Sequence, residues 1–436
     1  MQIVYWLSEQ QIAKADTKNE DGKELYKILN SLRVIEGSSF VAGPSAGLYL
    51  SQMGAEVIRF DQIGGGPDFN RWPLSNTGAS LYWEGLNKGK KSIAVNLSDP
   101  EGRELVQSLI CAPGSDCGMF LTNYPAKGFL AHEKLKERRE DLITVRVMGK
   151  PDGDIALDYT VNSAVGLPFI TGPEKLGDEP VNHVLPAWDL LTGSYAAFAL
   201  LAAERSRQET QIGREICIPL MDMATATMSN LGQLAEVIEA GADRPRYGND
   251  VFGFLGRDFV TADNKRAIIM ALTPRHWTGL IETLGIKDGI SQIEQEHGVS
   301  FDRDEGLRFI HRGAINKLIE DAVSKRQSAE LYAAFDENSV CWGPYNTLLE
   351  ASKDPAMVRD NPVFEEISHK SGLTYPAAGS PATVPDEERL SPVRAPYLGE
   401  HTDEILMDVL NLSSGEVGRL HDKNLVAGKE NSNADT

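Results

Sequence analysis

One carboxylate in this chain stands where a nucleophile could be held. Asp189 lies in the run Leu185–Ser194, at the predicted start of a long helix with a narrow face of small residues. An aspartate before a helix is often an N-cap, which accepts backbone N–H bonds. The same position stabilises an ionised carboxylate, and an ionised carboxylate can attack an acyl carbon. The local sequence leaves capping and catalysis both open.

Two further segments have the composition of loops that bind phosphate. Residues 37–47 follow a predicted strand, but their glycines stand at 37, 43 and 47, which is not the G-x-G-x-x-G spacing of a dinucleotide fold. Asp61 does end the next strand, so a nicotinamide-dependent oxidoreductase stays an alternative. Asn87–Ser92 places three lysines around one glycine without the spacing of a P-loop. For the first segment we rank an ordinary connection and a ligand loop equally, and for the second a solvated turn is favoured.

The cysteines and histidines indicate no metal site. Cys111, Cys117, Cys217 and Cys341 have no C-x-x-C spacing, and no group of histidine, cysteine and aspartate residues has the spacing of a zinc site. We therefore expect no metal, and reduced thiols in a cytoplasmic protein.

Composition and charge limit the class of protein. The chain has 436 residues, of which 41% are hydrophobic and 24% charged, which is an ordinary globular balance with enough length for two domains. The formal net charge of -20 argues against a nucleic-acid partner, whose phosphates would be repelled. No apolar run approaches the roughly 18–20 residues of a membrane span, and residues 1–32 lack the pattern of a secretory signal. We expect neither nucleic acid nor a membrane as a partner.

Strands and helices alternate through the part of the chain that would position Asp189. Strands are predicted at residues 32–36, 55–61, 92–97, 118–123, 142–148 and 215–220, and helices include 45–53, 99–110 and 189–208. Short helices between such strands favour a parallel sheet, hence an α/β fold. A hairpin that turns at Asp263–Asn264 and a set of helices follow. Residues 340–398 are predicted to be irregular, before a helix pair at 401–410 and 414–420.

In chain order these pieces resemble the class III CoA-transferases. The likeness extends from about Leu32 to Gly428, and the segments that carry it are Val34–Pro44, Gly54–Arg59, Asn87–Ile93, the helix opened by Asp189, Gly213–Glu215 and Ala395–Thr402. Other segments are similar to members that move CoA between two carboxyl groups of one dicarboxylic acid in 3-hydroxypropionate metabolism: Ile63–Asp68, Arg71–Pro73, Ile110–Gly114, Asn182–Asp189 and Asp243–Arg246.

The resemblance implies a fold and an assembly. A large Rossmann-like domain is built from both chain ends, with a smaller α+β domain between them. We expect an N-terminal extension at 1–31, a large domain at 32–245 completed by 339–436, and a small domain at 246–338. The family also implies an interlocked homodimer, in which two subunits thread through each other, and an acyl-CoA thioester as the partner. No cofactor is expected beyond the CoA of the substrate.

The resemblance also assigns roles to single residues. Asp189 matches the nucleophile, which carries the acyl group and then CoA. The CoA contacts that it implies are the loop Phe40, Val41, Ala42 and Gly43, the basic residues Arg59, Lys90 and Lys91, and Asn123 and Tyr124 beside the adenosine. Met148 stands where related transferases carry a lysine, so Lys150 would have to substitute. For the remaining carboxylate of the substrate we choose Arg71, with Trp188 and Tyr195 closing the pocket.

Intramolecular CoA transfer is the predicted function. An attacking Asp189 must be ionised, so we expect surroundings that do not raise its pKa much. The alternatives are an intermolecular CoA-transferase for another dicarboxylic acid, the oxidoreductase above, and a non-catalytic CoA-binding protein. Racemases of the same fold carry a Gly-His-Asp element where this chain has Ala156-Leu157-Asp158. Because leucine cannot move a proton, racemisation is disfavoured.

Overall fold

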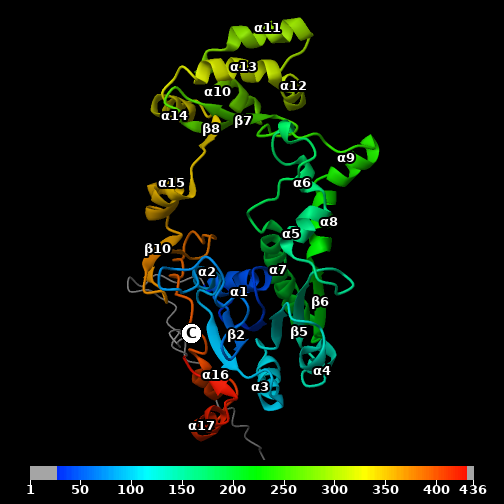
Figure 1. Cartoon of the computed structure of the whole chain (residues 1–436), viewed down its shortest axis with the longest axis vertical. Helices are drawn as coiled ribbons and strands as arrows, with labels where there is room; N and C mark the ends of the chain where they lie inside the picture. The colour runs from blue at the N-terminus through cyan, green and yellow to red at the C-terminus, as the bar shows by residue number, and fades with distance from the viewer. Residues whose placement is uncertain (1–26, 430–436) are drawn as a thin grey trace, which may run out of the picture. The chain divides into compact units, whose positions relative to one another are not determined.

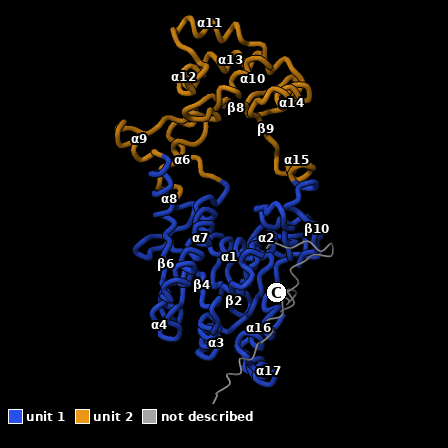
Figure 2. Tube along the Cα trace, turned by 180° about the vertical axis from the view of Figure 1, so that it is seen from behind, with its two compact units in different colours: residues 1–161, 184–231, 358–436 blue, residues 162–183, 232–357 orange. Residues whose placement is uncertain are grey.

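The computed structural model describes residues 27–429 of the chain. They divide into two compact units (Figure 2): unit 1 takes in the chain up to residue 161, residues 184–231 and the chain from 358 onward, and unit 2 takes in 162–183 and 232–357. The domain boundaries that we expect near residues 245 and 339 stay predictions. Most of the expected extension at 1–31 lies outside the described residues.

A seven-stranded sheet is the framework of unit 1 (Figure 1). The strand order is β12-β3-β2-β1-β4-β5-β6, and every neighbouring pair is parallel except β12 with β3. The strands are β1 (Arg33–Gly37), β2 (Glu56–Gln62), β3 (Lys91–Val95), β4 (Met119–Thr122), β5 (Ile143–Met148), β6 (Arg214–Pro219) and β12 (Val426–Ala427). The expected α/β fold with a parallel sheet is confirmed.

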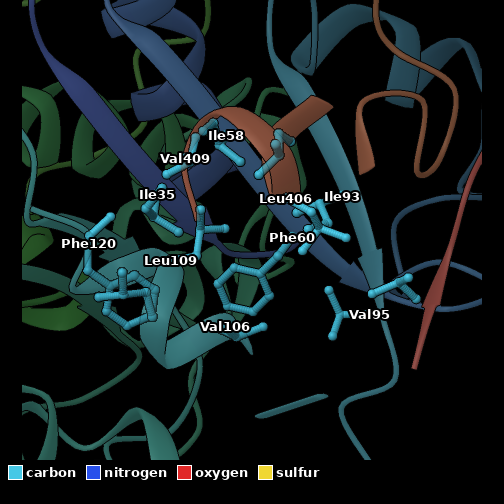
Figure 3. Close-up of a cluster of buried hydrophobic side chains, with 14 of the residues drawn as sticks. Ile35, Ile58, Phe60, Ile93, Val95, Val106, Leu109, Phe120, Leu406 and Val409 are labelled. Atoms are coloured by element: carbon cyan, nitrogen blue, oxygen red, sulfur yellow. The ribbon is translucent and has the colours of Figure 1, made fainter. Parts of the chain in front are cut away.

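Helices cover both faces of this sheet, so its central strands are buried on both sides, including the apolar residues Val34, Ile35 and Phe120. On one face, Phe60 and Phe120 belong to a core with side chains of α3, α4, α16 and α17 (Figure 3). On the other face α1 packs against α7. The helices of unit 1 are α1 (Ala42–Gln52), α2 (Leu81–Leu86), α3 (Pro100–Ile110), η1 (Gly128–Leu130), α4 (His132–Lys136), α7 (Ala187–Thr210), α8 (Leu220–Asn230), α16 (Thr402–Asp408) and α17 (Ser414–Asp422), and α5 (Asp158–Ala164) begins there.

Unit 2 has a three-stranded antiparallel sheet, β7-β8-β9, covered by helices around Trp277 and Phe301. The expected hairpin is β7–β8, and Asn264 in its turn has a φ of 59°, a conformation that asparagine tolerates. The elements of this unit are α6 (Leu167–Ile170), η2 (Glu174–Leu176), α9 (Gln233–Ala240), β7 (Leu255–Val260), β8 (Arg266–Ala271), α10 (Pro274–Leu284), α11 (Lys287–His297), α12 (Glu305–Ile310), α13 (Arg312–Val323), α14 (Ser328–Glu337), β9 (Cys341–Pro344) and α15 (Leu348–Lys353).

The segment expected to be irregular contains ordered elements. Besides β9 and α15 it holds η3 (Pro355–Arg359) and the hairpin β10 (Phe364–Ser368) with β11 (Thr374–Ala378). This hairpin is tied to α2, because the buried Glu84 carboxylate accepts hydrogen bonds from Ser371 and Tyr375. Because Ser371 lies 287 residues from Glu84 in the chain, the local sequence around Glu84 does not predict this contact. None of the helices in the described part of the chain is long and apolar enough to cross a membrane.

Candidate active site

A cleft of about 670 Å³ opens where β1, β4 and β5 end. It lies at the point where the strand order reverses, because the chain runs from β1 to β2 and β3 on one side and returns to β4 on the other. Open α/β sheets bind their ligands at this point. The lining comes from the three loops after these strands, with one residue each from α7 and α8: Ser39–Ala42, Asn123–Lys127, Arg146–Gly149, Asp152–Leu157, Asp189 and Leu220.

Close packing of α7 on α1 brings Asp189 to this cleft. Asp189 and Gly193 are one turn apart on the same face of α7. A β-carbon at Gly193 would lie 2.1 Å from Ser45 Oγ and 2.7 Å from the carbonyl oxygen of Ala42, so only glycine lets the two helices approach this closely. The predicted nucleophile and the predicted loop at Phe40–Ala42 are therefore brought together.

Asp189 does not cap its own helix. Pro186 occupies the N-cap position, and its side chain makes no capping hydrogen bond. The buried Asp158 carboxylate takes this role, since its Oδ2 accepts hydrogen bonds from the backbone N–H of Trp188 at 2.7 Å and of Asp189 at 3.0 Å. The Asp189 carboxylate itself forms no hydrogen bond or ion pair with the residues that the structure describes. It is half-buried in the cleft wall and available to a ligand.

The surroundings of Asp189 disfavour its ionised form. Burial, together with the negative charge of Asp158, raises the pKa of Asp189 to about 7, while the Arg71 guanidinium acts in the opposite direction. The expectation that its pKa would not be raised much is therefore wrong, because loss of solvation outweighs the nearby cation. An ionised carboxylate that is poorly stabilised is a better nucleophile, and near neutral pH a substantial fraction is ionised.

Arg71 and Tyr82 stand beside the nucleophile. The exposed Arg71 guanidinium lies over the rings of Phe40 and Tyr82, at 5.1 and 5.3 Å from their centroids, and its charge acts on both Asp189 and Tyr82. The Tyr82 hydroxyl is buried without a hydrogen-bond partner among the described residues, and burial raises its pKa. Nothing in the sequence pattern singled out Tyr82. A guanidinium at this place can receive a carboxylate.

The loop at Phe40 is held from two directions. Asn123 exchanges two hydrogen bonds with the backbone of Ser39, at 3.0 and 2.7 Å, and Asp68 Oδ2 accepts the backbone N–H of Phe40 at 3.2 Å. Phe40 itself has a φ of 69°, a left-handed conformation that a non-glycine residue keeps only when its surroundings impose it. Its backbone is thus fixed at the cleft in a strained form.

Arg59 does not reach the cleft. It is fully buried on the α1 side of β2, where it pairs with Asp61 and Asp68 at 2.9 Å each and stacks on Trp83. These carboxylates raise its pKa well above the ordinary value. Because Asp68 also holds the Phe40 backbone, Arg59 supports the cleft loop from beneath. Its direct contact with CoA stays a prediction that this geometry does not support.

Lys90 and Lys91 are likewise engaged elsewhere. Lys90 is buried, lies 2.8 Å from Glu36 and donates to the carbonyl of Pro44, and burial lowers its pKa to about 8. Lys91 bridges Glu56 and Glu404 at 2.7 and 2.6 Å. Neither lysine lines the cleft, so their CoA contacts also stay predictions without structural support.

A different cation is present at the cleft. Lys127 is exposed in its lining, and no carboxylate within residues 27–429 forms an ion pair with it. Tyr124 lines the same wall, and burial raises its pKa to about 12. Met148 and Gly149 contribute to the lining, whereas Lys150 lies near Asp154 at 3.7 Å. Lys127, which the sequence patterns did not single out, is the lysine best placed for a phosphate.

Besides Arg59, Lys90 and Lys91, four predicted residues lie outside the lining: Gly43, Arg71, Trp188 and Tyr195. Gly43 is inside α1, where a β-carbon would lie 2.4 Å from that of Ser38. Trp188 is buried beneath the start of α7. Tyr195 is 48% exposed on α7 next to Phe198, which is 62% exposed. No group of three or more histidine, cysteine, aspartate or glutamate side chains between residues 27 and 429 is arranged to hold a metal ion.

Comparison with known proteins identifies the family. The CoA-transferase family III profile matches residues 29–402, and the chain belongs to this family. It is 48% identical to 2-methylfumaryl-CoA isomerase of Chloroflexus aurantiacus, over 92% of this chain and 98% of that protein. It is 28% identical to succinyl-CoA--D-citramalate CoA-transferase of the same organism, over 91% and 98%. A CAIB/BAIF family protein from Brucella suis shares the fold, with a TM-score of 0.71, 24% identity, and coverage of 87% and 99%.

Proposed function

We propose that this chain moves CoA within one molecule, converting 2-methylfumaryl-CoA to 3-methylfumaryl-CoA through an aspartyl-CoA thioester at Asp189. The observation that carries this proposal is the half-buried, unpaired Asp189 carboxylate at the wall of the cleft. The 48% identity to an isomerase of this name over nearly the whole chain supports the choice of substrate. The setting would be a 3-hydroxypropionate pathway.

The transfer divides into four substitutions. An Asp189 oxygen attacks the C1 carbonyl of the substrate, the C–S bond breaks, and CoA leaves as the thiolate from a mixed anhydride. The thiolate then attacks the Asp189 carbonyl carbon, which gives aspartyl-CoA and the free C1 carboxylate of mesaconate. The C4 carboxylate of the retained mesaconate attacks aspartyl-CoA, forming a second anhydride and releasing the thiolate. Attack of the thiolate on the C4 carbonyl restores the Asp189 carboxylate.

Each part of the substrate would have a partner in the cleft or beside Asp189. The CoA chain would follow the apolar wall at Met148 and Tyr124, with a phosphate at Lys127. Arg71 would hold the carboxylate that is not reacting, which keeps mesaconate in place between the two halves of the reaction. The Tyr82 hydroxyl, which has no hydrogen-bond partner among the described residues, would donate a hydrogen bond to the oxyanion that develops during attack. No metal or redox group enters the scheme.

The assembly and location are parts of the same proposal. Leu191, Tyr195 and Phe198 form an exposed apolar stripe on α7, and they follow Asp189 by two, six and nine residues. We assign this stripe to the interface of the interlocked homodimer. All four cysteines are free thiols, which fits the reducing cytoplasm.

The test is incubation of the purified enzyme with 2-methylfumaryl-CoA and no added acid, followed by mass spectrometry of product and protein. We expect the C4 thioester, and a hydroxylamine-sensitive adduct on Asp189. Asp189→Asn should lose both. The control Asp408→Asn makes the same chemical change at an exposed position on α16 and should retain both.

The same experiment separates the alternative. Relatives such as the citramalate transferase carry names of intermolecular enzymes. Conversion that begins only when succinate or another free dicarboxylic acid is supplied would replace the proposed reaction by an intermolecular transfer. Exchange of isotope-labelled free mesaconate into the product would point the same way, because an intramolecular enzyme keeps its own acid.

A further inference from the structure

We propose that Asp158 is a positioning residue for CoA transfer in two ways: it accepts the amide N–H groups at the start of α7, so that the Asp189 carboxylate stays unbound and faces the cleft, and its own negative charge repels that of Asp189. This inference rests on the proposed function of Asp189 as the nucleophile. The hydrogen bonds of Asp158 Oδ2 are with the backbone of α7 and not with the side-chain oxygens of Asp189. Asp158 acts on Asp189 through its hydrogen bonds to the backbone of α7 and through its own negative charge.

The hydrogen bonds of Asp158 show how the amide donors at the start of α7 are satisfied. Asp158 is the first residue of α5 and is 2% exposed. A single oxygen, Oδ2, accepts both N–H groups, from Trp188 and Asp189. The first N–H groups of a helix have no partner within it, and they stabilise a nearby anion. Without Asp158, the carboxylate of Asp189 would be the nearest acidic group on α7 to satisfy them.

A nucleophile that satisfied these donors would be a weaker one. Two hydrogen bonds from amides would stabilise the ionised Asp189 before the reaction and would have to be broken during attack. They would also turn its oxygens toward the helix end, away from the cleft. With Asp158 in place, capping of α7 and catalysis are divided between two carboxylates. Two carboxylates in different surroundings commonly divide roles in this way.

The charge of Asp158 acts in the same direction. The charged and titratable groups that act on Asp189 are Asp158 from α5, Arg71 from the connection between β2 and α2, and Tyr82 from α2. Asp158 opposes ionisation of Asp189, and Arg71 favours it. When Asp189 becomes an anhydride or a thioester, its negative charge disappears and so does the repulsion. Asp158 therefore favours the covalent intermediates over the free enzyme.

The decisive variant is Asp158→Asn. Asparagine keeps an oxygen that can accept the two amide hydrogen bonds and removes the charge. We expect the pH at which kcat/KM is half-maximal to move down by at least one unit, and the fraction of trapped aspartyl-CoA at equilibrium to decrease by about tenfold. Hydrogen exchange at the Trp188 and Asp189 amides should stay slow. A purely structural cap would move neither the pH profile nor the trapped fraction.

Asp158→Ala removes both the cap and the charge. We expect fast exchange of the two amides and a larger loss of kcat than in Asp158→Asn. If the alanine variant does not fold, the asparagine variant still decides the question. A wild-type pH profile with wild-type adduct levels in Asp158→Asn, or a wild-type kcat in Asp158→Ala despite fast exchange of the two amides, would overturn the role of Asp158 while leaving the proposed function intact. Activity retained in Asp189→Asn would instead overturn the proposed function itself.

Discussion

Replacing Asp189 by asparagine should stabilise the protein, and more at pH 8 than at pH 5. The physical reason is the burial of a carboxylate that lacks a hydrogen-bond partner in the described structure. Its folded pKa of about 7 lies above the ordinary value of 3.8. Between these two values the unfolded chain releases the proton that the folded protein still holds. The folded state therefore loses stability as the pH rises through this window, and the full penalty is present above pH 7.

The size of the effect follows from the pKa difference. About three units at 1.36 kcal/mol each give a penalty of roughly 4 kcal/mol at pH 8, and about 1.7 kcal/mol at pH 5, where the unfolded carboxylate is already ionised. Both figures are upper bounds, because the side chain keeps some contact with solvent. Asparagine is uncharged at every pH. The difference in free energy of unfolding between variant and wild type should thus grow by about 2–3 kcal/mol from pH 5 to pH 8.

Urea unfolding followed by circular dichroism measures this difference. Since the chain has two units, hydrogen exchange of the α7 amides should be used to assign the transition to unit 1. Asp408→Asn removes the same charge from an exposed site on α16 and corrects for the general effect of net charge. A stabilisation that is equal at pH 5 and pH 8, or a loss of stability at pH 8, would refute the argument that Asp189 is ionised at a cost.

Three further outcomes are expected. The value of kcat/KM should rise with pH and be half-maximal near pH 7, since Asp189 must be ionised to attack; a flat profile from pH 5.5 to 8.5 would contradict this. Lys127→Ala should raise KM for the CoA thioester about tenfold with little change in kcat, whereas Lys91→Ala should not, and the reverse result would restore the original assignment of Lys91. Arg59→Met should lower the free energy of unfolding by about 3–5 kcal/mol, because Asp61 and Asp68 lose their buried partner; a change below 1 kcal/mol in urea unfolding would be inconsistent with the buried network.

The elements of unit 1 could be predicted because their patterns are local. Strand β2 has the buried apolar residues Val57, Ile58 and Phe60 around Arg59, and α3 begins at Pro100 after Asp99, whose side chain accepts the N–H of Glu101. Strand β12 could not be predicted, since it has two residues and is defined by its pairing with β3. The same holds for Glu84, whose partners come from the hairpin near the other end of the chain.

The position of Arg59 in the sheet argues against a direct contact with CoA, and the sequence contains the physical reason. The resemblance to the family implies that Arg59, a basic residue in a strongly acidic chain, contacts the nucleotide of CoA. Yet Arg59 lies between Ile58 and Phe60 in a strand of a parallel sheet, and such strands are buried on both faces. A charge in the interior must be paired there. The exposed Lys127 follows a proline in a loop, where a cation can remain free for a ligand. Position relative to the sheet, and not local charge density, separates these two cases.

The reactivity of Asp189 depends on residues that its own neighbourhood does not contain. The segment Leu185–Ser194 left capping and catalysis both open for Asp189, and the need for an ionised nucleophile suggested a pKa that is not raised much. Asp158, 31 residues earlier, takes the capping hydrogen bonds, and Arg71 comes from another strand connection altogether. Both contacts exist only because Gly193 lets α7 approach α1 and the sheet orders β1, β4 and β5 side by side. A family resemblance can therefore point to a candidate nucleophile that local sequence leaves open, whereas the protonation of this carboxylate at neutral pH is a property of the assembled fold.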